Sequence, residues 1–417
     1  MKILYIDIFA ESINPTAALT PLLFRTVTPN TIFYGPGLVS RTILENGLRR
    51  FIDRAGPFDV AVFGPNIPIL SDDENAAVAA TEYLSRFAAL APDPMLILTF
   101  LNDVLHEATD IPIRTKILST LNFDYYACSN AQIERIHAGS FHIVGPNRQA
   151  VCKLAELPNY AREERHFRRK SKRLCDAYAE FVSQYPERIV TAFHFVAETE
   201  FTFRHSEARR YKINIPGVEY VLRRRARKAI ANSEFMLAPK RVFNLYRLLG
   251  KLGVEPFARY VPLNLYHAAF REGLIDSQLV YTARGGFGIP IRKFFEIPAA
   301  GALMICTPPH GFGALGFHDG EHYIEADPEA LPNVVTALSH DAERVSRIAQ
   351  QGQALVFDQH SLAARAHQIR SCLEALVDGT YRGADWVGGK LVLRSGNDQP
   401  VAREPSAKRA LAVENGA

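Results

Sequence analysis

One acidic residue, Glu296, stands in a run of the sequence that otherwise looks like protein core. It follows two phenylalanines and precedes an Ile-Pro-Ala-Ala run, in the stretch IPIRKFFEIPAAGALMIC at residues 289–306. An ionised carboxylate in an apolar setting costs several kcal/mol of folding free energy unless hydrogen-bond donors meet it. Those donors come either from a ligand or from Arg292, four residues earlier on the same expected helix.

A glycine-rich turn, RGGFG at residues 284–288, precedes this helix and could bind phosphate. Gly285 and Gly286 allow the backbone to approach a diphosphate closely, and the following helix begins with free N–H groups. Arg284 and Arg292 could each donate two hydrogen bonds to the same anion. Paired glycines also occur in many ordinary turns. The chain has neither G-x-G-x-x-G after its first strand nor G-x-x-x-x-G-K-[ST], which disfavours dinucleotide and P-loop chemistry.

Basic residues concentrate in the stretch from 204 to 228. Three of them, Arg204, Lys212 and Arg223, are candidates for binding a diphosphate. Two other interpretations stay open. Arg223 could pair with Glu219 four residues earlier on a helix, or the basic residues could form a solvated or anion-binding surface.

The elements that must position these residues alternate between apolar, strand-like runs and stretches with apolar residues at helical spacing. Strands are expected at residues 3–8, 31–34, 58–64, 95–100, 123–129, 141–145, 188–198, 233–239, 256–262, 278–283 and 302–306. Strands that are separated by helices and buried on both faces form a parallel, doubly wound sheet. At 417 residues the chain exceeds what one hydrophobic core usually organises. We therefore predict an α/β fold with two Rossmann-like domains facing a central cleft, where the carboxyl ends of both sheets bind ligands.

The stretch RGGFGIPIRKFFEIPAAGALMICTP, followed by LGFHDGEHYIEADPEALPNVVTAL and a long helical region, resembles a known family. It is similar to the C-terminal donor domain of bacterial glycosyltransferases of group 1, which have the two-domain GT-B fold and an R-x-x-F/Y-E-x-x-A-x-G core. The resemblance covers residues 278–375 and implies that Glu296 bonds the ribose hydroxyls of a nucleotide-sugar donor. Two positions depart from it: Gly288 stands where many relatives have a second acid, and Pro298 removes one backbone donor from the helix.

The pattern of strands, helices and charges along the sequence indicates how the chain is divided, and the resemblance implies the acceptor and donor roles of the two domains. Residues 1–150 would be a Rossmann-like acceptor domain, 151–187 a helical connector, and 188–394 a Rossmann-like donor domain. The polar, Pro- and Ala-rich residues 395–417 are expected to be a disordered tail.

A catalytic base is required if the sugar transfer inverts the anomeric centre. Candidates after the first-domain strands are Glu11, Asp103 and His106, although each of these residue types is common at helix caps and on surfaces. His194 and His310 are expected to be structural, although His310, which follows the expected strand at 302–306, could border the donor. A retaining enzyme would need no such base.

Composition limits the setting and the partners. The formal charge of +4 is too small to indicate nucleic acid, and five scattered cysteines without a C-x-x-C pair favour a reducing compartment. We expect a cytoplasmic protein, with peripheral association at the inner face of a membrane left open. The predicted partners are a nucleotide-sugar donor and a glycan, lipid or protein acceptor. No cofactor and no metal are expected, because no acidic pair resembles a divalent-cation site. The alternative function is a non-catalytic basic protein that binds an anionic membrane or nucleic acid on a degenerate glycosyltransferase fold.

Overall fold

The structure of the protein is a computed structural model, and the residues that it describes fall in several separate ranges of the chain. The described residues are 1–7, 19–35, 37–65, 96–101, 141–144, 189–201, 208–217, 221–239, 244, 248, 260–284, 290–309 and 311–394.

A six-stranded parallel sheet organises the first half of the chain. Its strand order is β2-β1-β3-β4-β5-β6, and every neighbouring pair is parallel. The strands are β1 (Ile3–Ile6), β2 (Thr31–Tyr34), β3 (Val60–Phe63), β4 (Leu96–Leu101), β5 (Phe141–Val144) and β6 (Ile189–Thr191). The described helices between them are α1 (Thr20–Val27), α2 (Arg41–Glu45) and α3 (Leu48–Ala55). β1 and β3 are buried along their whole length, as expected of strands covered on both faces.

A second parallel sheet, with the order β10-β9-β8-β7, organises the other half. Its strands are β7 (Tyr211–Asn214), β8 (Ser277–Ala283), β9 (Leu303–Thr307) and β10 (Ile324–Glu325). The described helices in this half of the sequence are α9 (Val221–Ile230), α11 (Tyr260–Ile275), α12 (Lys293–Ala299), α13 (Leu331–Ser339), α14 (Ala342–Gln359) and α15 (Leu362–Val377). An antiparallel hairpin, β11 (Ala384–Val387) and β12 (Lys390–Leu393), follows. The predicted fold class, α/β with two Rossmann-like units, is confirmed.

Two of the expected strands are wrong. Residues 260–262 open helix α11, and Pro262 is tolerated there because the first turn of a helix leaves its N–H groups unpaired anyway. Residues 233–239 form no strand; Leu237 makes only a single bridge to Ile213 of β7. The expected strand at 123–129 and residues 256–259 lie outside the described residues.

Helix α12 is short because two residues near its carboxyl end, Pro298 and Gly301, favour its termination. Pro298 cannot donate a backbone hydrogen bond, and Gly301 follows the helix with φ of 68°, a conformation that glycine adopts without steric penalty. The N–H of Gly301 donates to Pro298 O at 2.7 Å and the N–H of Ala302 donates to Ile297 O at 3.3 Å. This pair of bonds is a Schellman motif, which turns the chain sharply into β9.

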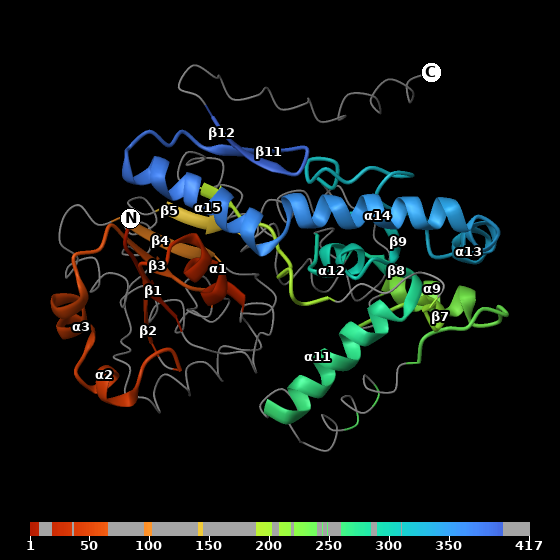
Figure 1. Ribbon diagram of the computed structural model, residues 1–417, viewed down its shortest axis with the longest axis horizontal. Coiled ribbons are helices and arrows are strands. Elements are labelled where there is room, and N and C mark those ends of the chain that lie inside the picture. Colours follow the sequence, from red (N-terminus) through yellow and green to blue (C-terminus); the bar gives the residue numbers. More distant parts are fainter. Residues whose placement is uncertain are drawn as a thin grey trace, which may run out of the picture.

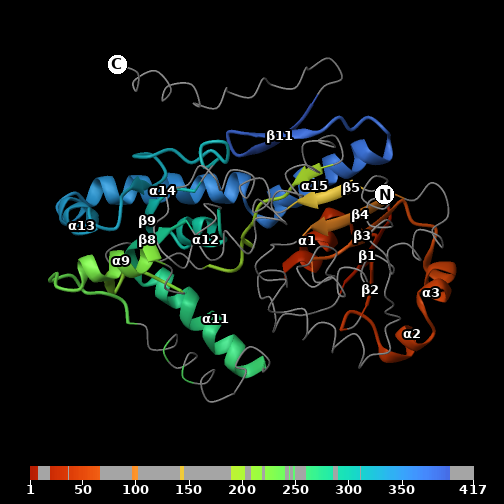
Figure 2. The same cartoon turned by 180° about the vertical axis from the view of Figure 1, so that it is seen from behind.

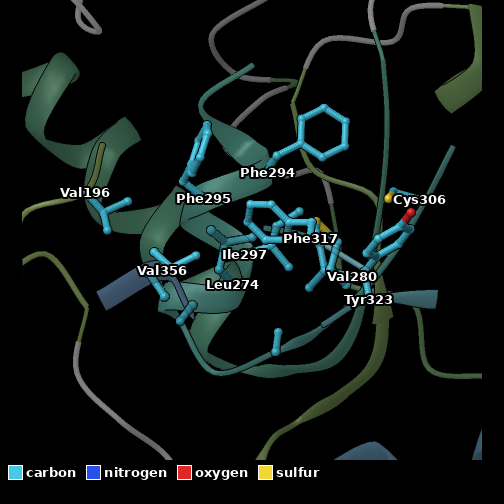
Figure 3. Packing of buried hydrophobic residues seen from close by; sticks show 14 of the residues in the cluster. Val196, Leu274, Val280, Phe294, Phe295, Ile297, Cys306, Phe317, Tyr323 and Val356 are labelled. Atoms are coloured by element: carbon cyan, nitrogen blue, oxygen red, sulfur yellow. The ribbon is translucent and has the colours of Figure 1, made fainter. Parts of the chain in front are cut away.

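The apolar side chains of α12 form the centre of one core (Figure 3). Phe294, Phe295 and Ile297 are fully buried. They pack with Val280 of β8, Cys306 of β9, Val356 of α14 and the loop residues Phe317 and Tyr323. Because three apolar residues anchor α12 from within, its polar residues Arg292, Lys293 and Glu296 are held in fixed positions at its first two turns.

The chain passes between the two sheets twice. Residues 192–201 lead from β6 toward the second sheet, and His360 and Ser361 lead back from α14 to α15. The two crossings pair with each other, since Val196 N–H donates to His360 O at 3.1 Å and Leu362 N–H donates to Val196 O at 2.8 Å. Figures 1 and 2 both place α14 with the second sheet and α15 with the first.

Helix α15 is therefore part of the first core although it lies late in the sequence. Its residues Ala366, Ile369, Cys372 and Leu373 are buried with side chains of β1, β3 and α1. Arg370 also donates to Val27 O, at the end of α1. The predicted domain boundaries stay predictions, and the predicted connector 151–187 and tail 395–417 lie outside the described residues.

Trp386, the only tryptophan of the chain, lies where the crossings meet the hairpin. Its indole Nε1 donates to Thr191 O at 2.9 Å. Phe193 meets the ring edge-on at 5.0 Å, and the Arg365 guanidinium lies 4.5 Å from the ring centroid. The Trp386 side chain thus attaches strand β11 to the end of β6 and to Phe193 in the forward crossing.

Candidate functional site

Glu296 is buried, with 7% of its surface exposed, and has an internal partner. Arg292 donates from Nη1 to Glu296 Oε1 at 2.6 Å, which is the i,i+4 ion pair that the sequence left open as an alternative to a ligand. Among the described residues the second oxygen, Oε2, has no hydrogen-bond partner. The ion pair therefore uses only half of the carboxylate, and the other half remains able to accept a hydrogen bond from a ligand.

Arg292 is also bound on its other side. Its Nη2 donates to both carboxylate oxygens of Glu200, at 2.5 and 2.6 Å, and its Nε donates to Phe195 O at 3.3 Å. Burial alone would lower the pKa of Arg292, but Glu296 and Glu200 outweigh it and the pKa is raised. Arg292 is therefore a permanent cation between two carboxylates.

A second pair of cations, Arg223 and Lys293, gathers at the turn that follows β7. The Arg223 side chain is buried, and its Nη1 donates to Pro216 O at 3.3 Å. Gly217 in this turn has φ of 83°, and a Cβ added there would lie 2.6 Å from Lys293 Cε and 3.3 Å from Arg223 Nη1. Only glycine lets the backbone come so close to both side chains.

Lys293 differs from the arginines in its electrostatics. Burial lowers its pKa to about 8, nearby Arg223 and Arg292 lower it as well, and Glu296 acts in the opposite direction. In the described part of the chain its ammonium has no ion pair within 4.0 Å; it lies 5.4 Å from the centroid of the Phe270 ring. An anion that binds beside a lysine in this setting stabilises the buried ammonium, because the charge is then paired.

These groups lie at the carboxyl ends of the second sheet. Gly217 and Arg223 follow β7, whereas Lys293 and Glu296 lie on α12, which follows β8. Open parallel sheets bind ligands at this edge.

The other predicted site residues are placed as follows. Arg284 directly follows β8, and its backbone N–H donates to Thr307 O at 3.2 Å. Lys212 lies near the amino end of β7, where its Nζ donates to Gln278 Oε1 at 3.0 Å. The structure thus brings Arg223 and Glu296 to one edge of the sheet and places Lys212 toward the other. The remaining predicted residues lie outside the described part of the chain: Glu11, Asp103, His106, Arg204, Gly285 and Gly286.

His194 lies in the forward crossing, close to the same cations. Its pKa is lowered to about 3, first by burial and then by Arg292, Arg365 and Lys293. The imidazole is therefore neutral at physiological pH, and the structural role expected of His194 stays a prediction.

Sequence reasoning missed two residues of this site. Lys293 stands inside the quoted motif, next to Arg292, and its place in the first turn of a short helix could have identified it. Glu200 lies 92 positions before Arg292, and nothing local in the sequence connects the two.

Comparisons with known proteins concern the part of the chain that carries these residues. Residues 198–371 match the model of a family described as glycosyl transferase-like. No curated protein matches the chain.

Several solved structures are similar in overall shape. The crystal structure of Anabaena HepE in complex with UDP has 13% sequence identity and a TM-score of 0.48, covering 90% of this chain and 100% of that one. Sucrose-phosphate synthase from Thermosynechococcus elongatus has 10% identity and a TM-score of 0.49, covering 91% and 100%. A glycosyltransferase from Rickettsia africae has 10% identity and a TM-score of 0.46, covering 90% and 98%.

The family match includes Glu200, Arg223, Arg292, Lys293 and Glu296. It confirms the resemblance to glycosyltransferases that was predicted from the sequence, and with it the prediction of a glycosyltransferase enzyme, for residues 198–371. No helix among the described residues combines the length and the apolar character needed to cross a membrane. No group of three or more His, Cys, Asp or Glu side chains in the described ranges could hold a metal ion.

Proposed function

We propose that this chain transfers a sugar from a nucleoside diphosphate-sugar donor to a hydroxyl group of an acceptor. The bond between the anomeric carbon and the diphosphate oxygen breaks, a bond to the acceptor oxygen forms, and the acceptor loses its proton. The observation that carries the proposal is the state of Glu296, a buried carboxylate with one oxygen held by Arg292 and the other without a partner in the described structure. The two neighbouring hydroxyls of a ribose are suitable donors to that oxygen.

The diphosphate belongs beside Arg223 and Lys293. Both cations meet at Gly217, where the backbone approaches them without a side chain in between. Negative charge that develops on a leaving diphosphate is stabilised most by cations that are already in place and partly shielded from water. We therefore propose a metal-independent reaction, in which donor turnover persists in EDTA. Turnover that is lost in chelator and restored by Mg²⁺ or Mn²⁺ would contradict this part of the proposal.

The acceptor is assigned to residues 1–150, and its chemical class is a glycan, a lipid or a protein. If the reaction inverts the anomeric centre, Glu11, Asp103 or His106 is proposed as the base that takes the acceptor proton. The variants Glu11→Gln, Asp103→Asn and His106→Ala are compared. The base is the residue whose replacement abolishes transfer while leaving nucleotide binding intact.

The nucleotide site is tested by binding rather than by turnover. A thermal-shift screen with UDP, GDP, dTDP, ADP and CMP identifies the nucleotide, because a ligand of the folded state raises its stability. For that nucleotide, Glu296→Gln is expected to weaken binding by about 1.5–3 kcal/mol, the range for hydrogen bonds to charged groups. Glu374→Gln, the same change at an exposed position of α15, serves as the control. Unchanged affinity in a folded Glu296→Gln protein would remove the ribose assignment.

A second function is favoured by one feature, the exposed basic residues Arg224, Arg225 and Lys228 of α9. On this alternative the chain is a non-catalytic protein that binds anionic membrane or nucleic acid. Binding of acidic vesicles or nucleic acid that falls steeply with salt, together with no hydrolysis or transfer of any nucleotide sugar, would favour it over the enzyme. A cytoplasmic enzyme held at a membrane face would show both activities.

A further inference from the structure

Three charged side chains form a continuous chain of contacts from the donor edge of the second sheet to the forward crossing. Glu296 on α12 is bonded to Arg292, and Arg292 is bonded to Glu200, which lies at the end of the crossing formed by residues 192–201. Glu200 is itself fixed, because Ala197 N–H donates to its Oε2 at 2.6 Å. We call these three residues the Glu200–Arg292–Glu296 triad.

The triad decides how the guanidinium of Arg292 is oriented. A guanidinium prefers to present two parallel N–H groups to both oxygens of one carboxylate. In this protein Nε donates to Phe195 O, Nη2 donates to Glu200, and only Nη1 reaches Glu296, through a single oxygen. With all three nitrogens engaged, Arg292 cannot turn to grip both oxygens of Glu296.

We propose that Glu200 is a positioning residue for nucleotide recognition, which holds Arg292 away from Oε2 of Glu296 and so keeps that oxygen available to the ribose hydroxyls of the ligand. The inference rests on the proposed function, because it concerns the same Glu296. Glu200 itself does not touch the ligand. Its effect is transmitted through Arg292 alone.

This arrangement predicts that, without the charge of Glu200, Arg292 and the ribose hydroxyls compete for Glu296. When the charge of Glu200 is removed, Arg292 keeps one carboxylate partner and rotates to bind Glu296 with two hydrogen bonds. The ribose hydroxyls must then displace a bond between charged groups, which is stronger than the neutral hydrogen bonds of water that they displace otherwise. A nucleotide without ribose hydroxyls does not enter this competition.

The experiment measures affinities by calorimetry for UDP, GDP and ADP and for their 2′,3′-dideoxy counterparts. Glu200→Gln is expected to lower the affinity for the ribonucleotide that binds by about tenfold, the equivalent of one hydrogen bond to a charged group. Its affinity for the dideoxy form stays unchanged. Glu198→Gln is the matched control, because Glu198 lies in the same crossing but bonds Ala363 N–H instead of Arg292.

A double-mutant comparison tests whether the effect of Glu200 on nucleotide affinity is transmitted through Arg292. In an Arg292→Gln background there is no guanidinium to redirect, so adding Glu200→Gln causes no further loss of affinity. A loss that persists in this background, or that is equal for the ribonucleotide and its dideoxy form, shows a general structural effect and overturns the inference. Unchanged ribonucleotide affinity in Glu200→Gln overturns it as well.

Two further results keep the outcomes distinct. If Glu200→Gln fails to fold, Glu200→Asp replaces it, since the shorter acid keeps the charge but withdraws it from Arg292, and a selective loss of ribonucleotide affinity is again expected. A parent protein that binds none of the five nucleotides of the thermal-shift screen overturns the proposed function, whereas a parent that binds one without dependence on Glu200 overturns only the positioning role.

Discussion

At the scale of single residues, the site combines groups of different electrostatic character. Despite burial, Glu296 and Glu200 raise the pKa of Arg292, but the pKa of Lys293 is lowered to about 8 from 10.5. The charged lysine is disfavoured by burial first and by Arg223 next. Lys293 is therefore a cation of the site whose charge changes within an accessible pH range.

Nucleotide affinity is expected to fall as the pH rises through about 8, because the bound diphosphate favours the protonated lysine. At pH values around and above 8 binding takes up a proton, because the bound diphosphate raises the pKa of Lys293, and calorimetry detects this uptake as a heat that depends on the ionisation enthalpy of the buffer. Lys293→Met should abolish this proton uptake, and Lys228→Met, at an exposed position of α9, should not. Uptake that survives in Lys293→Met would place the titrating group elsewhere.

The lowered pKa of Lys293 makes folding stability depend on pH in the direction opposite to nucleotide affinity. Below about pH 8 Lys293 is charged in both the folded and the unfolded state, and its burial opposes folding. Between 8 and 10.5 the folded state loses its proton first, so the free energy of unfolding contributed by Lys293 rises with pH. Binding and stability therefore change in opposite directions over this window.

At the scale of elements, α12 shows how much the sequence specifies. Its apolar residues, its short length and its end at Gly301 all follow from local chemistry, since Pro298 removes a donor and glycine alone takes a positive φ at no cost. The strands β1, β3, β8 and β9 were predicted from apolar runs for the same reason. The opening of α11 was not, because its mixed aromatic and apolar residues fit a strand as well as a helix.

The parts of the site that could not be predicted depend on long-range contacts. Arg292 and Glu296 are neighbours on one helix, so their ion pair could be foreseen from spacing. Glu200 reaches Arg292 only because the forward crossing passes α12 in the folded chain. The meeting of Lys293 with Arg223 likewise requires the packing of α12 near the turn after β7.

Gly301→Ala is expected to lower the free energy of unfolding by about 1–2 kcal/mol, because alanine is strained at a positive φ. Chemical denaturation measures the change. The control is Gly313→Ala, at a position where an added Cβ meets nothing within 4 Å and where φ is not positive, so a small gain or no change is expected there. An equal loss in both variants would show that the positive φ at Gly301 is not the cause.

At the scale of the whole molecule, the two units are connected through the end of the chain. Helix α15 follows the second sheet in sequence but buries its apolar face against the first (Figure 1). The backbone pairing of Val196 with Ser361 joins the outgoing and returning segments side by side. The first core is therefore completed only after α15 has been synthesised and has folded back.

Leu373→Ala is expected to destabilise the protein by about 2–5 kcal/mol, since Leu373 is 1% exposed within the first core. Leu265→Ala in α11, where the side chain is 64% exposed, should change stability by less than about 0.5 kcal/mol. Denaturant unfolding compares the two. A small effect of Leu373→Ala would mean that the first unit does not depend on α15.

The position of Trp386 has a practical consequence for spectroscopy. Because the chain has a single tryptophan, its emission arises from one known place, the junction of the two crossings with β11. The Arg365 cation over the indole ring and the partly buried hydrogen bond to Thr191 O set the polarity that this fluorophore senses. Rearrangement of the crossings would change the emission wavelength or its quenching. The protein thus carries a native optical probe of its interdomain junction, and no extrinsic dye is required to follow it in real time.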